Sequence, residues 1–131
     1  MKIGLAVGHS RLGDQGAYTS GEYIVSEWDF NRAMVRRIGH LLSNTCGWAI
    51  GDDYTIYDQY PARSYTGAIN YLARKLKEDA VDAVIELHFN SARLSASGHE
   101  WLYWHTSRGG KRLATALRDE MEASYPHRIV A

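Results

Sequence analysis

Residues 81–90 read Val-Asp-Ala-Val-Ile-Glu-Leu-His-Phe-Asn, and this stretch decides the fold. Its first seven residues are mostly apolar, which is typical of a buried strand in a layered α/β domain. Alternation along a strand places Glu86, His88 and Asn90 on one face. Because open α/β sheets bind ligands at the carboxyl ends of their strands, we predict a site here. A hydrogen-bonded core histidine is the alternative interpretation of His88, whereas a metal ion would also satisfy a neutral imidazole.

A second predicted strand, residues 2–7, is followed at once by Gly-His-Ser, in which the histidine is His9. His9 therefore occupies the same kind of position as His88. The connection over residues 11–23 is glycine-rich and has no periodicity, which indicates an irregular surface loop of a length that is usually functional. A metal-free alternative, in which residues 8–13 hold the phosphate of a small molecule, has weak support because no Lys follows at the required spacing.

Helical periodicity recurs in three segments. Ser26 is a predicted N-cap with Asp29 three residues on, so the first helix is expected to begin at Glu27. Pro61 opens the second helix, and residues 107–124 form the third. A carboxylate in the first turn is favoured by the helix dipole, so an ordinary N-terminal glutamate is the alternative interpretation of Glu27. The predicted buried stripes are Phe30, Met34, Ile38, Leu41 and Leu42 in the first helix, Tyr65, Ile69, Leu72 and Leu76 in the second, and Leu113, Ala114, Leu117 and Met121 in the third.

Short strands are predicted between these helices. Residues 48–57 suggest one short strand or a broken pair, and the aromatic residues 101–105 suggest another strand, which either packs in a core or forms a platform for a sugar or peptide. Alternating strands and helices predict an α/β fold. We expect a single domain over residues 1–131, with a mixed, mostly parallel sheet of about five to six strands flanked by helices on both faces.

The composition limits the partners of the chain. Its 15 basic and 15 acidic residues give a formal net charge of zero, which argues against a nucleic-acid partner or an anionic membrane surface. Cys46 is the only cysteine, so an intrachain disulfide and a thiolate-rich metal site are excluded. No apolar run is long enough for a signal peptide or a bilayer span, so we expect no membrane insertion. Any bound metal has to use histidine and carboxylate ligands.

His9, Glu27 and His88 together supply two imidazoles and one carboxylate. With an open fourth position this is the ligand set of a catalytic zinc site. The two histidines lie far apart in the sequence, so nothing local brings them together. The hypothesis requires that the strands before His9 and His88 end side by side, with Glu27 of the first helix above them.

At these residues the sequence resembles a known family. The similarity is to the zinc-dependent N-acetylmuramoyl-L-alanine amidases (amidase type 3), and most of all to phage endolysins, through Val-Gly-His-Ser and Ile-Glu-Leu-His. It implies a six-stranded mixed sheet, Zn²⁺ bound by His9, Glu27 and His88, and hydrolysis of the amide between N-acetylmuramic acid and the first L-alanine of peptidoglycan. Glu22 is a competing carboxylate, but it lacks the Phe-Asn continuation that follows Glu27. The matching pieces are Gly8-His9-Ser10, Gly16-Ala17, Glu27 with Phe30-Asn31, residues 86–92 and residues 98–104.

The resemblance also implies a second, proton-transferring glutamate at the end of a late strand, expected beyond Ala131. Either the chain is a catalytic domain without its C-terminal strand and helix, or another carboxylate substitutes, with Glu86 as the stand-in and Glu100 as a structural residue. The alternative function is a catalytically incomplete homologue that binds the cell wall. The expected partner is peptidoglycan, and the expected location is the host cytoplasm until release to the wall or periplasm. No role is assigned to His40, His99, His105 and His127.

Overall fold

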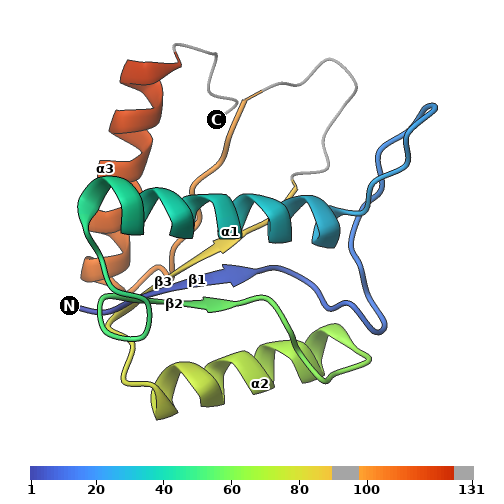
Figure 1. The fold of residues 1–131 in the computed structure, drawn as a ribbon, viewed down its shortest axis with the longest axis horizontal. Coiled ribbons are helices and arrows are strands. Elements are labelled where there is room, and N and C mark those ends of the chain that lie inside the picture. Colours follow the sequence, from blue (N-terminus) through green and yellow to red (C-terminus); the bar gives the residue numbers. More distant parts are fainter. Residues whose placement is uncertain (90–97, 126–131) are drawn as a thin grey trace. The chain divides into compact units, whose positions relative to one another are not determined.

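The computed structural model describes residues 1–89 and 98–125. The chain divides into two compact units, Met1–Phe89 and Asn90–Ala131. The predicted positions Asn90, residues 91–97 and residues 126–131 lie outside the described part. The first unit contains β1 (Ile3–Val7), α1 (Glu27–Cys46), β2 (Tyr54–Tyr57), α2 (Tyr65–Glu78) and β3 (Ala83–Leu87), and the second contains α3 (Arg108–Ser124) (Figure 1).

The three strands form a parallel sheet in the order β2-β1-β3. β1 is the central strand, with Ile3 paired to Tyr54 on one side and to Ala83 on the other. The chain moves one way across the sheet from β1 to β2 and the opposite way from β2 to β3. Because crossovers are right-handed, this reversal places α1 and α2 on opposite faces, as Figure 1 shows. Helices on both faces were predicted and are confirmed.

Each face of the sheet has its own core cluster, because successive β1 side chains alternate between the faces. The first cluster lies on the α1 side and contains Ile3, Leu5, Val7, Trp28, Val35 and Tyr54. The second lies on the α2 side and contains Ala6, Tyr57, Tyr60, Ala68 and Leu72. With β1 covered on both faces, the carboxyl ends of β1 and β3 are held at a fixed edge.

The predicted sheet was too large. Over residues 1–89 and 98–125 the structure has three strands, all parallel, rather than five to six in a mixed sheet. Residues 101–105, predicted as a strand, are irregular and end in a turn, and Leu102 and Trp104 are exposed. Aromatic enrichment was misleading there because β propensity depends on a pairing strand, and none pairs with these residues in the described chain.

Over residues 1–89 and 98–125, no helix is both long enough and apolar enough to cross a membrane.

The predicted buried stripe of α1 was correct only in part. Ile38 and Leu42 pack against the core, whereas Phe30, Met34 and Leu41 are exposed. Trp28 and Val35, which were not predicted, are buried. The N-cap at Ser26 and the start at Glu27 are as predicted, so the error lies only in which apolar residues of the helix face the sheet. A smaller error affects α2, where Tyr65 and Ile69 are exposed and Ala68 and Leu72 are buried.

Candidate metal centre

Three elements bring the predicted ligands to one edge of the sheet. His9 follows β1, His88 follows the neighbouring β3, and Glu27 is the first residue of α1. One ring nitrogen of each histidine and one carboxylate oxygen of Glu27 lie within 4.8 Å of one another. The structure therefore confirms that the three predicted side chains converge, and their role as metal ligands stays a prediction.

The spacing of these atoms fits a small metal ion. Oε1 of Glu27 lies 3.3 Å from Nε2 of His9 and 3.2 Å from Nδ1 of His88. Ligands at zinc bond lengths in a tetrahedron are separated by about 3.3 Å. The donor types and the two separations from Glu27 are thus of the kind that zinc uses, and all three ligand atoms lie within 4.8 Å of one another.

Glu27 is not an ordinary helix carboxylate, because it is only 2% exposed. Its Oε2 accepts a hydrogen bond from the backbone N–H of Ala17 at 3.0 Å, and its Oε1 accepts one from Phe89 at 2.7 Å. A buried carboxylate is stable only when it is paired, and two N–H donors with two imidazoles provide that pairing. The same contacts fix Oε1 between the histidines.

His9 has an unusual backbone conformation, with φ of 68°, which is left-handed and rare for a residue with a side chain. Backbone hydrogen bonds hold it on both sides. Gly8 N–H donates to Leu87, and Ser10 N–H donates to Asp14. The buried Ser10 hydroxyl also donates to the carbonyl of Ala62. Strain that the surrounding structure over-determines in this way is typical of functional sites.

Asp14 is a site residue that the sequence analysis missed. Its Oδ1 lies 3.3 Å from Nδ1 of His9, a buried nitrogen that makes no hydrogen bond within the described residues. The same Oδ1 accepts the N–H of Gly16 at 3.1 Å, so an Asx turn holds the carboxylate beside the ring. An aspartate two residues before a glycine was the available signal. Carboxylates in this position orient metal-binding imidazoles.

Two glycines are explained by the same close packing. A Cβ at Gly8 would overlap the ring of His88. A Cβ at Gly16, where φ is +74°, would lie 2.5 Å from Oε2 of Glu27. Only glycine fits at these points, which gives a physical reason for both glycines in the pattern quoted above.

His88 has a carboxylate at each ring nitrogen. Nδ1 faces Glu27, and Nε2 lies 3.4 Å from Oε1 of Glu86. Hydrogen bonding to Glu86 raises the pKa of His88, burial lowers it, and the charges of Glu86 and Glu27 raise it further. Glu86 is therefore close to the site, and its contact is with the ring of His88.

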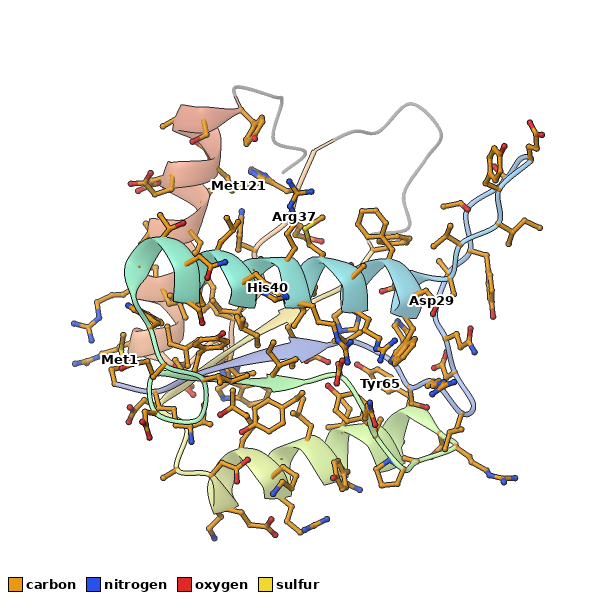
Figure 2. The ribbon with its side chains drawn as sticks, in the orientation of Figure 1. Met1, Asp29, Arg37, His40, Tyr65 and Met121 are labelled. Atoms are coloured by element: carbon orange, nitrogen blue, oxygen red, sulfur yellow. The ribbon has the colours of Figure 1, made fainter. Side chains whose placement is uncertain are left out.

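Asn31 and Tyr65 also border the site. The Asn31 amide donates to the carbonyl of Leu87 at 3.2 Å, which ties α1 to the end of β3 just before His88. Tyr65 begins α2 (Figure 2), and its ring centroid lies 5.7 Å from that of His9. The Phe-Asn continuation after Glu27 was noted in the sequence, but this tethering role of Asn31 was not predicted.

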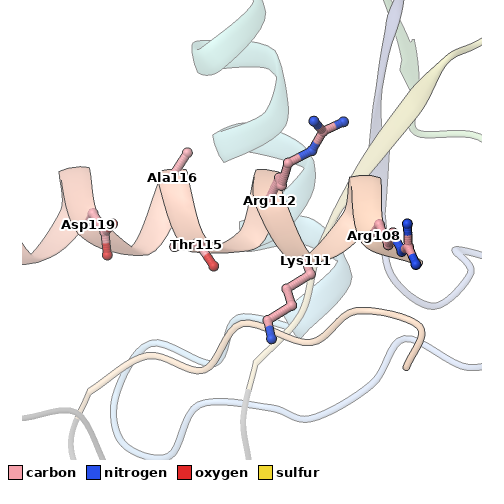
Figure 3. Close-up of a pocket in the computed structure, with 6 residues that line it drawn as sticks. All are labelled: Arg108, Lys111, Arg112, Thr115, Ala116 and Asp119. Atoms are coloured by element: carbon pink, nitrogen blue, oxygen red, sulfur yellow. The ribbon is translucent and has the colours of Figure 1, made fainter. Parts of the chain in front are cut away.

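The other polar residues that were considered from the sequence and that the structure describes are not in the cluster. Glu22 is exposed in the loop before α1, and His40 is exposed on α1 (Figure 2). Glu100, His99 and His105 belong to the second unit. That unit has a hollow along α3, in which Lys111 and Arg112 point away from each other (Figure 3). Its basic groups do not converge on one point, and we assign it no role.

The fold and the site together define a small α/β domain with a His/Glu/His candidate metal centre at the carboxyl edge of a parallel sheet. Residues 3–129 match the family model of N-acetylmuramoyl-L-alanine amidase, and the chain belongs to this family. Comparison with curated proteins and with solved structures gave no match. Membership supports a peptidoglycan amidase activity in general.

Proposed function

We propose that the chain is a zinc-dependent peptidoglycan hydrolase that cleaves the amide between N-acetylmuramic acid and the L-alanine of the stem peptide. The observation that carries this proposal is the convergence of His9, Glu27 and His88 in a member of the amidase family. Two neutral donors and one carboxylate leave a net positive charge on a divalent ion, which suits it to polarise a carbonyl.

The residues of the chain have distinct tasks in this proposal. His9, Glu27 and His88 would hold the ion, which would supply Lewis-acid chemistry at the scissile carbonyl and lower the pKa of a bound water. Asp14, whose Oδ1 lies 3.3 Å from Nδ1 of His9, would orient that ring when Nε2 binds the ion. The backbone N–H groups of Ala17 and Phe89 hold the carboxylate of Glu27 in place between the histidines.

Hydrolysis of an amide also needs a group that carries a proton to the leaving amine. We propose Glu86 as the stand-in for this task, because it is a half-buried carboxylate beside a ligand and is not itself one of the three. Its contact with Nε2 of His88 is compatible with a second task, the orientation of that ring.

The test is metal analysis and a cell-wall assay on the wild type, His88→Ala and the control His40→Ala, an exposed histidine on α1. We expect about one zinc per chain and new L-alanine amino termini for the wild type and the control. We expect His88→Ala to lose both. Equal activity in zinc-loaded and metal-free protein would refute the proposal.

The second candidate is a wall-binding homologue that retains zinc without hydrolysis. The contact between Glu86 and His88 favours it, because orientation of the His88 ring alone would account for the position of Glu86 without proton transfer. This candidate predicts that the zinc-loaded protein sediments with insoluble cell wall but releases no new amino termini from it.

We further propose that the protein is a phage endolysin that stays in the host cytoplasm until it is released to the wall. The support is the resemblance of Val-Gly-His-Ser and Ile-Glu-Leu-His to that group. Expression inside a bacterium should cause lysis only when a membrane pore is supplied as well. Lysis without the pore would contradict this location.

A further inference from the structure

The loop between His9 and Glu27 begins and ends at a proposed ligand. At its start the Ser10 hydroxyl donates to Ala62. At its end the N–H of Glu27 donates to the carbonyl of Ala17 at 2.7 Å, while Ala17 donates back to the carboxylate of Glu27. The loop is thus attached to the site at both ends.

The outer part of this loop, residues 18–26, is a short hairpin. Tyr18 and Ser26 form an antiparallel bridge, and Thr19 N–H donates to Val25 at 3.0 Å. The Thr19 hydroxyl crosses the hairpin, donating to the carbonyl of Tyr23 and accepting from Val25 N–H. Figure 1 shows the loop, in blue, extending away from the sheet beyond the N-terminal end of α1. These bonds hold its tip in one conformation.

The hairpin exposes apolar side chains that have no structural need to be there. Tyr18 is 60% exposed, Tyr23 79% and Ile24 71%. The bridge between Tyr18 and Ser26 holds the two arms of the hairpin together, so these three exposed side chains lie on one short projection. Exposed apolar groups gathered beside a site indicate a binding surface.

The chemistry of the hairpin distinguishes between the two halves of the proposed substrate. Glu22 is the only charged residue in residues 18–26, and it is negative. A stem peptide with free carboxylates would be repelled by it. A neutral glycan has apolar C–H faces for Tyr and Ile, and hydroxyl groups for the phenols of the tyrosines.

We propose that residues 18–26 are a glycan-binding arm, which grips the N-acetylhexosamine strand through Tyr18, Tyr23 and Ile24 while the amide lies at the metal centre. This inference rests on the proposed function for the identity of the polymer. It adds a recognition surface to a site whose other described residues bind the ion and the scissile group.

The test uses soluble β-1,4-linked N-acetylglucosamine oligomers as the probe, with Tyr23→Ala, Ile24→Ser and the control Ile50→Ser. Ile50 is 64% exposed and precedes β2, at the edge of the sheet opposite to the site. We expect Tyr23→Ala and Ile24→Ser to bind the oligomers and insoluble wall at least about tenfold more weakly, a change of roughly 1.4 kcal/mol. Ile50→Ser should bind like the wild type, and all three variants should retain zinc.

Three results would contradict the proposal. The first is a wild type that does not bind the oligomers, and the second is hairpin variants that bind them as the wild type does. The third is binding of isolated stem peptide, but not of the oligomers, that is weakened by the hairpin substitutions, because this would assign the surface to the peptide. Binding is measured in the presence of a chelator, so that hydrolysis cannot affect the result. A wild-type protein that binds the glycan but has no amidase activity with zinc would refute the proposed function and leave the glycan-binding arm standing.

Discussion

At the residue scale, a His9 ring that binds zinc through one nitrogen must carry its proton on the other nitrogen. Nε2 faces Glu27, and Nδ1 faces Asp14 at 3.3 Å. Replacing Asp14 with Ala removes the carboxylate that would favour a proton on Nδ1 when zinc is bound at Nε2, so we expect zinc to bind about 10- to 100-fold more weakly. Competition with a chelator measures this, and the ¹⁵N shifts of His9 report the tautomer. The Gln15→Ala control should leave both unchanged, and an unaltered tautomer in Asp14→Ala would contradict the role.

Glu86 provides the second prediction at this scale. Glu86→Gln keeps a side chain of the same shape beside Nε2 of His88 but cannot accept and return a proton. If Glu86 transfers protons, kcat on muramyl peptides should fall by about 100-fold or more with zinc content unchanged. The measurement is kcat together with metal stoichiometry. Unchanged kcat with weaker zinc binding would show that Glu86 orients His88 instead.

At the element scale, the orientation of α1 about its axis can be tested directly. Val35 is fully buried, whereas Leu41, which the periodicity predicted to be buried, is 55% exposed. We expect Val35→Ala to lower the free energy of unfolding by about 2 kcal/mol through lost burial and a cavity. Leu41→Ala should change it by less than about 0.5 kcal/mol. Urea unfolding measures both, and the reverse order would mean that α1 packs as the sequence pattern first suggested.

The elements were predictable to different degrees, for physical reasons. β1, β3 and the start of α1 follow from strong local signals, namely apolar runs and the cap at Ser26. The buried face of α1 was not predictable, because apolar residues such as Phe30 also occupy its exposed side. There the ring centroid of Phe30 lies 5.3 Å from that of Phe89. Strand pairing is a tertiary property, so the aromatic residues 101–105 could not be assigned from propensity.

The C-terminal end of α2 is tied to β2 by a pH-dependent bond. The Tyr57 hydroxyl donates to Oδ2 of Asp79 at 2.9 Å, and this bond, followed by the bond from Lys75, lowers the pKa of Asp79. A depressed carboxylate pKa stabilises the fold above the unfolded pKa, and this stabilisation is lost as pH falls through the folded pKa. We therefore expect the stability difference between wild type and Tyr57→Phe to shrink below about pH 4.

Tyr54→Phe is the matched control for this prediction, because the Tyr54 hydroxyl bonds the carbonyl of Gly39 rather than a carboxylate. Its cost should be similar at pH 7 and pH 3. Urea unfolding of both variants at the two pH values provides the comparison. A Tyr57→Phe cost that is the same at both pH values would show that the bond to Asp79 does not stabilise the fold.

At the scale of the whole molecule, the site depends on contacts that no local signal specifies. His9 and His88 meet only because β1 and β3 are neighbours in register, with Val7 opposite Leu87. The ligand types could be predicted from the sequence, since histidines at strand ends are visible there. The Asp14 contact and the strained backbone of His9 could not, because both result from how the following loop folds back.

Because the ligands come from three elements of the first unit, ion binding should stabilise that unit as a whole. Zinc that binds the folded chain and not the unfolded chain contributes about 2.7 kcal/mol when its free concentration is 100 times Kd. For a chain of this length that corresponds to a rise in Tm of roughly 8 °C. Thermal unfolding with zinc and with chelator measures the rise. His40→Ala should show the same rise and His88→Ala almost none, whereas an equal rise in all three proteins would place the bound zinc at another site.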